Sequence, residues 1–167
     1  MDFYEAIQKR HSVRSYTDAP VEREKLDRIL QAAVMAPTAV NKQAFRVFVI
    51  STKGRAEDFK RIYPREWLAQ PPYVLLICTK KDKCWIRRDG KSYGDVDSAI
   101  VMDHIILAAT AEGLGTCWVG AFNAEAAKEV LGLPENLEPV AFTPLGYAAD
   151  GAFQKMRKSA GELVEYK

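Results

Sequence analysis

The sequence predicts a single compact domain that contains both helices and strands. Its 167 residues fit one domain, and the 48% hydrophobic content is enough for a core of ordinary globular size. Some segments space their apolar residues as an amphipathic helix does, whereas others are short apolar runs typical of buried strands. No repeat, low-complexity tract or linker interrupts this pattern, so residues 1–167 are expected to form one domain.

The first helix is expected to begin at about Phe3. Asp2 and Glu5 have the spacing of a capping box, in which the Asp2 side chain accepts from the first turn and Glu5 reaches back. Phe3, Ala6 and Ile7 lie on one side of this helix and are predicted to form its buried strip.

A second amphipathic helix is predicted to end before Pro37, because proline removes a helical donor and clashes with the preceding turn. Its apolar residues follow the i, i+3, i+4, i+7, i+8 spacing and are therefore expected to face the core. They are Leu26, Ile29, Leu30, Ala33 and Val34.

The next part of the chain predicts two strands that flank a helix. Residues 45–50 form the first strand, and residues 55–62 suggest the helix. Residues 73–79 follow two prolines and form a continuous apolar run, which favours a central strand buried on both faces.

The segment from Lys80 to Tyr93 changes composition sharply, because six cations surround Trp85 and Ile86. Two interpretations remain open. The segment is either a solvated loop anchored by one tryptophan, or a mobile cover over a ligand in which Trp85 supplies an apolar surface.

Residues 97–112 form the most apolar helix of the chain, and Gly113 is a candidate left-handed cap at its end. Apolar residues occupy almost every side of this helix, which predicts that it is buried all round. A domain of this size cannot easily enclose such a helix, so part of it is expected to bury against a second subunit.

Residues 114–122 are predicted to form a strand bounded by glycines. Gly120 lacks a side chain and would let a planar ligand approach its backbone N–H, although a bulge or a tight strand end explains this glycine equally well. A short helix, 124–131, is expected between the cap candidates Asn123 and Gly132.

The remaining residues predict a last core strand at 140–147 and then a polar tail. The tail offers one more helix start at residues 159–162. It also carries Lys155 and Arg157, which are far from Arg10 in sequence but free to meet it in space.

Composition excludes several classes of protein. The 24 Lys and Arg residues nearly balance 22 Asp and Glu residues, so no general electrostatic attraction to nucleic acid or to an anionic membrane is expected. The apolar runs are interrupted by charges before they could span a bilayer. The first residues lack the basic and apolar regions of a signal peptide, which points to the cytoplasm.

The three cysteines, Cys78, Cys84 and Cys117, have no C-x-x-C spacing, and only His11 and His104 could join them. A zinc site or a disulfide framework is therefore not expected, and no metal ligands are assigned. Catalytic thiol chemistry would require a base beside the thiol, and neither histidine has a sequence context that places it there.

The stretch from Lys9 to Tyr16 is the main candidate binding segment. Arg14 alternates with Val13 and Ser15, so the segment after the first helix is expected to be extended, with neighbouring side chains on opposite sides. Arginine suits an anionic ligand because its planar fork stays charged and pairs with phosphate or with a carbonyl edge. A solvated basic turn is the alternative interpretation.

The connection from Pro37 to Gln43 carries a hydroxyl and two amides next to a strand. Such side chains often satisfy only their own backbone, and from these residues alone that interpretation is favoured.

Four separated segments, in the same order, resemble the FMN-dependent nitroreductase family over nearly the whole chain. Each segment alone is a weak signal, but the four in order make a strong match. They are Arg10-His11-Ser12-Val13-Arg14, the loop Pro37 to Gln43, the segment Gly113 to Phe122, and Lys155-Met156-Arg157.

The resemblance implies a three-layer α/β/α architecture of the α+β class, with a central, mainly antiparallel sheet. It also implies an interlocked homodimer with two FMN sites at the interface, in which residues from about 148 to 167 wrap the partner subunit. The apolar helix 97–112 then fits as the interface helix.

The resemblance also implies roles for individual residues. Arg10, Ser12, Lys155 and Arg157 would hold the phosphate and ribityl chain, and Arg14 would lie by the N1 and O2 edge of the flavin. Thr38, Ala39, Asn41 and Gln43 would reach the flavin of the other subunit, and the Gly120 N–H would bond N5. The remaining family positions at the cofactor are His11, Pro37, Trp118 and Val119. For His11, a side chain that only packs against its neighbours is an equally good interpretation.

The implied activity is an NAD(P)H-dependent FMN oxidoreductase. Hydride passes from NADH or NADPH to flavin N5, and the electrons then pass to a small stacked acceptor such as a nitroaromatic or a quinone in a ping-pong mechanism. Arg14 and Gly120 are the candidate catalytic residues, Arg14 because it would stabilise charge on the reduced flavin. The alternative is a flavin-binding or flavin-remodelling protein without nicotinamide turnover.

Two departures from the family pattern concern the site. Pro64 and Trp67 stand where many relatives offer a polar side chain to the pyrimidine edge of the flavin, and Ala44 replaces a common proline. The chain also lacks a long insertion that covers the active site in larger relatives, and the segment Lys80 to Tyr93 is the candidate substitute.

Overall fold

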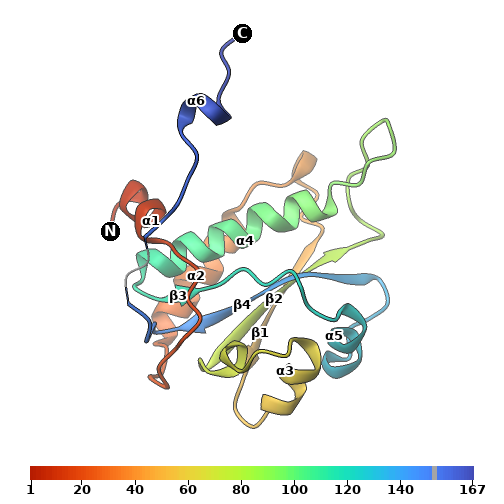
Figure 1. Cartoon of the computed structure of the whole chain (residues 1–167). Coiled ribbons are helices and arrows are strands. Elements are labelled where there is room, and N and C mark those ends of the chain that lie inside the picture. The colour runs from red at the N-terminus through yellow and green to blue at the C-terminus, as the bar shows by residue number, and fades with distance from the viewer. Residues whose placement is uncertain (152–153) are drawn as a thin grey trace.

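Residues 1–151 and 154–167 are described by a computed structural model, in which helices cover both faces of a sheet (Figure 1). The sheet has the strand order β1-β2-β4-β3, and all of its pairs are antiparallel. The strands are β1 (Phe45–Ser51), β2 (Tyr73–Lys80), β3 (Gly115–Thr116) and β4 (Leu137–Gly146). This arrangement confirms the predicted three-layer α+β architecture.

The helices divide between the two faces. The layer above the sheet in Figure 1 contains α1 (Phe3–Lys9), α2 (Arg23–Met35) and α4 (Gly94–Ala111), and the layer below contains α3 (Ala56–Ile62) and α5 (Ala124–Leu131). The short elements are η1 (Ala39–Asn41), η2 (Glu66–Ala69) and α6 (Ala160–Leu163).

Strand β2 supplies side chains to both cores. Leu75 and Ile77 join α2 and α4 in one cluster of buried residues, whereas Val74, Leu76 and Cys78 join α3 and α5 in the other. Successive side chains of a strand point to opposite faces, and helices cover both faces of this sheet, so all five side chains are fully buried. The central position predicted from the continuous apolar run is thus confirmed.

Local signals in the sequence set several helix ends. The capping box of Asp2 and Glu5 is formed at α1, and α2 ends at Met35, two residues before Pro37. Asn123 caps α5 by accepting a hydrogen bond from the Ala126 N–H, and Gly132 ends it in the left-handed conformation. These four features confirm the predictions made from short-range spacing.

The predicted buried strip of α1 is wrong for the isolated chain. Ala6 is buried, but Phe3 is 61% exposed and Ile7 is 43% exposed. Val34 of α2 is also exposed. Helical spacing correctly placed these residues on one side of each helix. The middle of each strip is buried, at Ala6 in α1 and at Leu26, Ile29 and Ala33 in α2, whereas Phe3, Ile7 and Val34 stay exposed.

Helix α4 begins three residues earlier than predicted and is not buried all round within one chain. A Cβ at Gly94 would lie 2.4 Å from the Thr79 side chain and 2.6 Å from the Cys84 sulfur, so glycine permits the close packing at this end. Val96 and Ala111 are exposed. The open side of α4 forms, with α1 and α2, a groove of about 400 Å³ lined by Phe3, Ala6, Ala32, His104, Leu107 and Ala108 among others.

The strand predicted at residues 114–122 is mostly absent, since β3 contains only Gly115 and Thr116. The next N–H, that of Cys117, donates to the Thr143 hydroxyl at 3.1 Å instead of a backbone carbonyl. Backbone pairing returns only at an isolated bridge between Val119 and Phe142. A side-chain acceptor therefore interrupts the ladder directly after β3.

The segment between β2 and α4 forms a hairpin. Ile86 pairs with Ser92, and Trp85 packs edge-on against Tyr93 with ring centroids 4.8 Å apart. The hairpin projects from the body beside the start of α4 (Figure 1). Its predicted role as a cover over a ligand stays a prediction.

The polar tail leaves the body near α1, forms α6 and continues past it to the C-terminus (Figure 1). The capping box of Ser159 and Glu162 is formed there, and the residues from 156 to 167 are all exposed. No helix in residues 1–151 or 154–167 is both long and apolar enough to cross a membrane.

Candidate functional site

The predicted binding segment is extended and lies between β3 and the start of the tail. The Val13 N–H donates to the Thr116 carbonyl at 2.9 Å on one side, and the Ala149 N–H donates to the Ser15 carbonyl at 2.8 Å on the other. Val13 is 1% exposed, whereas Arg14 next to it is exposed. The predicted alternation is therefore confirmed, and the segment is fixed by backbone pairing at both edges.

Asp150 anchors this segment to the tail. One of its carboxylate oxygens accepts a hydrogen bond from the Arg14 N–H at 2.9 Å, and the other lies 4.0 Å from Nε2 of His11. The His11 Nδ1 lies 3.1 Å from the Lys9 carbonyl and must donate to it, which leaves Nε2 directed toward Asp150. The His11 ring is thus packed between the end of α1, at Lys9, and the start of the tail, at Asp150.

The guanidinium of Arg14 remains accessible. It donates to the Ser12 carbonyl at 3.3 Å, and it forms no salt bridge with a carboxylate in the described residues. Arg14 also acts on Cys117: burial raises the pKa of this thiol, while Arg14, the Ser12 hydroxyl and Arg10 each oppose the increase. The structure thus brings Arg10, Ser12 and Arg14 together around the residue that follows β3.

Three cations from distant parts of the sequence converge at the end of α1. The Lys155 ammonium donates to the Ile7 carbonyl at 2.5 Å. Its pKa is lowered, first by burial and then by the positive charges of Arg10 and Arg157. None of the three forms a salt bridge with a carboxylate in residues 1–151 or 154–167. The cluster of Arg10, Lys155 and Arg157 therefore has uncompensated positive charge, which suits an anion.

The chain after β3 carries three further candidate residues, which follow Cys117 directly: Trp118, Val119 and Gly120. Val119 is buried and exchanges two backbone hydrogen bonds with Phe142, while Trp118 is 39% exposed and Gly120 is exposed. A Cβ at Gly120 would lie 3.7 Å from the nearest atom, in the Trp118 indole, which is an ordinary contact. Nothing in the described residues requires a glycine at this position.

The loop from Pro37 to Gln43 has an unusual backbone. Val40, Asn41 and Gln43 have φ values of 44°, 56° and 48°, in the left-handed region that residues with side chains rarely adopt. Residues held in such regions cost on the order of 1–3 kcal/mol each and often occur at functional sites. The Val40 side chain is also 70% exposed. A simple polar connection would not require these backbone conformations, so they favour a functional role for the loop.

Part of the polarity of this loop is satisfied internally, as the sequence suggested. The Thr38 hydroxyl accepts a hydrogen bond from the Gln43 N–H at 3.0 Å, and the Gln43 amide donates to the Asn41 amide oxygen at 3.0 Å. The Asn41 and Gln43 side chains nevertheless remain exposed.

Within one chain, the loop does not meet the binding segment. The loop contacts the first turn of α4 through Asp97, whereas Arg10 and His11 line a cavity of about 200 Å³ with Thr110, at the other end of the helix. Asp97 and Thr110 are thirteen residues apart, which corresponds to roughly 20 Å along an α-helix. The two predicted parts of the site therefore lie at opposite ends of α4 in one protomer.

Three side chains with a role at these segments were not predicted. They are Asp150, Asp97 and Gln70, whose amide oxygen accepts a hydrogen bond from the Tyr16 N–H at 3.1 Å. Gln70 lies in the region where Pro64 and Trp67 depart from the family pattern, and Trp67 itself packs against Tyr63. None of the three had a distinct signal in the sequence, since Asp97 is one of several acids in the predicted apolar helix.

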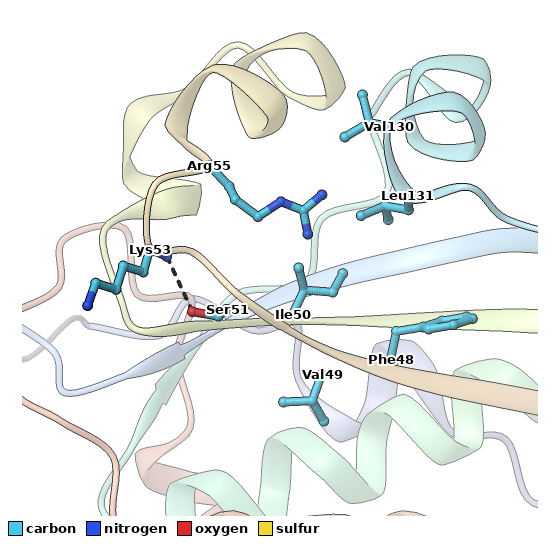
Figure 2. A pocket seen from close by; sticks show the side chains of 8 residues that line it. All are labelled: Phe48, Val49, Ile50, Ser51, Lys53, Arg55, Val130 and Leu131. Atoms are coloured by element: carbon cyan, nitrogen blue, oxygen red, sulfur yellow. Dashed lines mark hydrogen bonds between the residues drawn. The ribbon is translucent and has the colours of Figure 1, made fainter.

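A separate hollow lies on the opposite layer. It has a volume of about 340 Å³ and is bounded by the end of β1, by Arg55 and by Leu131 of α5 (Figure 2). The Arg55 guanidinium is already paired with Asp58 at 2.9 Å. None of the predicted site residues lines this hollow, so it is not the candidate site.

Metal and disulfide chemistry have no counterpart in the described part of the chain. No group of three or more histidine, cysteine, aspartate or glutamate side chains there is placed to hold a metal ion. Cys78, Cys84 and Cys117 are free thiols, and burial raises the pKa of Cys78 to about 12.

Comparisons with known proteins give a consistent result. The profile of the nitroreductase family matches residues 7–72 and 59–147. A solved nitroreductase family protein from Clostridium difficile 630 is 38% identical, with a TM-score of 0.92 over 100% of this chain and 99% of that protein. An FMN reductase (NAD(P)H) from Bacillus subtilis strain 168 is 31% identical over 91% of this chain and 68% of its own length. A solved FMN-dependent nitroreductase from Clostridium difficile R20291 is 25% identical, with a TM-score of 0.83 over 96% of both chains.

Proposed function

Because this chain belongs to the nitroreductase family, we propose that it is an NAD(P)H-dependent oxidoreductase that holds FMN between the segment Arg10 to Arg14 and a loop of a second copy. The observation that carries this proposal is the convergence of Arg10, Lys155 and Arg157 without a carboxylate partner in the described residues. The names of relatives, an FMN reductase and an FMN-dependent nitroreductase, support the choice of flavin.

The cation cluster fits the phosphate of FMN. A phosphate supplies two negative charges and several acceptor oxygens, which would relieve the repulsion that lowers the pKa of Lys155. In the proposed site, the Ser12 hydroxyl, on the same segment, would donate to the ribityl chain or the phosphate. Binding would therefore stabilise the start of the tail, because Lys155 and Arg157 both belong to it.

Arg14 and Gly120 suit the ring end of the cofactor. Arg14 has an accessible guanidinium on a segment fixed by backbone pairing, so its charge can stabilise negative charge at N1 and O2 without reorganisation. Gly120 has an exposed backbone, and no neighbour in the described residues explains why it lacks a side chain. A flavin lying against its N–H would supply that explanation.

A second copy would complete the site. The loop Pro37 to Gln43 lies roughly 20 Å from the binding segment along α4, so one protomer cannot use both on the same flavin. Exposed apolar side chains on α1 and α2, namely Phe3, Ile7 and Val34, and the open groove along α4 support burial against a partner. In the proposed homodimer, residues from about 148 to 167 wrap the partner subunit.

FMN would supply the redox chemistry, accepting a hydride from NADH or NADPH and then reducing a small stacked acceptor, such as a nitroaromatic or a quinone, in a ping-pong sequence. The residues of this chain would bind the phosphate, orient the ring and stabilise charge. No protein acid or base is required for these tasks, and no free carboxylate or thiol is assigned one.

The test is to purify the protein, remove any bound flavin, and titrate the apoprotein with FMN. We expect saturable quenching of flavin fluorescence with one FMN per chain. Rapid anaerobic loss of the visible flavin absorbance with NADH or NADPH is the second expected result. Failure to bind FMN would refute the proposal, whereas tight binding without reduction by either nicotinamide would favour a flavin-binding or flavin-remodelling protein.

A further inference from the structure

Asp97 is the buried carboxylate that the proposed chemistry does not use. It lies in the first turn of α4 and is only 2% exposed. One oxygen accepts a hydrogen bond from the Ala39 N–H at 2.9 Å, and the other is buried without a hydrogen-bond partner in the described residues. No salt bridge to Asp97 is present in that part of the chain either. Burying a carboxyl group that has no opposite charge beside it destabilises the fold, so we expect Asp97 to perform a role at this position.

This hydrogen bond joins the loop to the rest of the protein. The other hydrogen bonds of residues 38–43 stay inside the loop: Asn41 and Lys42 donate to the Thr38 and Ala39 carbonyls, and Gln43 bonds Thr38 and Asn41. Among the described residues, the bond from Ala39 to Asp97 is the one that reaches another element. Asp97 is therefore the residue through which the loop hydrogen-bonds to α4.

The loop needs such an anchor because its backbone is strained. Val40 and Asn41, directly after Ala39, have positive φ values, and both side chains are exposed, so packing contributes little to hold them. The Asp97 side chain supplies the acceptor that holds the N–H of Ala39, the residue directly before the strained positions.

We propose that Asp97 is a positioning residue for the cofactor loop, acting through Ala39 to hold Thr38, Asn41 and Gln43 in the conformation that receives FMN of the partner subunit. This inference rests on the proposed function. It adds that Asp97 holds the FMN loop against the first turn of α4. A change at Asp97 would therefore alter FMN affinity although Asp97 does not contact the flavin.

The experiment compares Asp97→Ala and Asp97→Asn with Asp95→Ala. Asp95 is an exposed acid in the same turn of α4 and makes no bond to the loop, so its variant controls for the charge at the helix end. Hydrogen exchange followed by mass spectrometry on the apoproteins reports the loop directly. Titration with FMN reports the cofactor affinity, and thermal unfolding reports global stability.

We expect Asp97→Ala to speed exchange in the peptide spanning residues 37–44 and to weaken FMN binding about tenfold, or about 1.4 kcal/mol. Asp97→Asn keeps an acceptor oxygen and should remain within about threefold of the wild type. Asp95→Ala should match the wild type in both measurements. A purely structural role of Asp97 would lower the unfolding temperature without a selective change at residues 37–44.

Wild-type FMN affinity and unchanged exchange at residues 37–44 in Asp97→Ala would overturn the inference. If Asp97→Ala does not fold, Asp97→Ser carries the same test, because a serine hydroxyl is too short to hold Ala39 in place. A wild-type protein that binds no FMN would instead refute the proposed function, and the exchange data on the apoproteins would still decide whether Asp97 holds the loop.

Discussion

Replacing Lys155 by methionine separates the two effects of the cation cluster. In the apoprotein, the change removes one hydrogen bond to the Ile7 carbonyl, about 1 kcal/mol, but also removes repulsion with Arg10 and Arg157. These effects oppose each other, so the free energy of unfolding should change by less than about 1 kcal/mol. With FMN, the variant loses a charged donor to the phosphate, worth about 1.5–3 kcal/mol. Because two cations remain, we expect the lower end of that range, or roughly a tenfold weaker affinity.

The assay is a fluorescence titration of the apoprotein with FMN, together with thermal unfolding without the cofactor. Lys158→Met is the matched control, because Lys158 is an exposed lysine of the same tail. We expect the control to bind FMN as the wild type does. If Lys155→Met binds FMN within about twofold of the wild type, the cluster is not the phosphate site.

Three further changes test other parts of the account. Arg14→Ala should keep the fold, weaken FMN binding and slow reduction by NADH or NADPH, as followed by flavin absorbance; an unchanged affinity and rate would show that Arg14 is wrongly placed. Trp85→Ala should alter the relative rates with different acceptors more than it alters FMN affinity, and the reverse result would assign Trp85 to the cofactor or to folding. Arg28→Met should lower the unfolding temperature slightly at neutral pH, because Arg28 donates two hydrogen bonds of 2.7 Å to Glu112 and thereby lowers the pKa of that carboxyl. A carboxyl whose pKa is lowered by folding stabilises the fold at pH values above its usual pKa, and this stabilisation is lost as the pH falls through the lowered pKa. The difference in unfolding temperature between Arg28→Met and the wild type should therefore vanish in acid. A difference that does not change with pH would contradict this role of Arg28.

The sequence predicted features that depend on short-range chemistry. The capping box at Asp2, the cap at Asn123 and the helix end at Gly132 each involve residues within a few positions of one another. The two-sided burial of β2 was also predictable, because a strand with apolar residues on both faces must lie inside a sheet. The four segments of the proposed site were found by resemblance to a family, since each one alone is ambiguous.

Features that depend on distant partners were not predictable. Helical spacing placed Phe3 and Ile7 on one side of α1 but could not reveal that, in one chain, both stay exposed while Ala6 between them is buried. The strand after Gly113 was predicted too long, because the Thr143 hydroxyl replaces a backbone acceptor at Cys117. Asp97 read as an ordinary acid near a helix start, and its importance depends on where the loop around Ala39 packs.

A mixed-dimer experiment tests the central claim, that one FMN site is built from two copies, most directly. One chain carries Arg10→Ala and Arg14→Ala, and the other carries Asn41→Ala and Gln43→Ala, so each homodimer should bind FMN poorly. In the mixed dimer, one site combines all four changes and the other has none. We predict that purified mixed dimers recover wild-type FMN affinity at one site per dimer. No recovery in the mixed dimer would contradict a site shared between subunits.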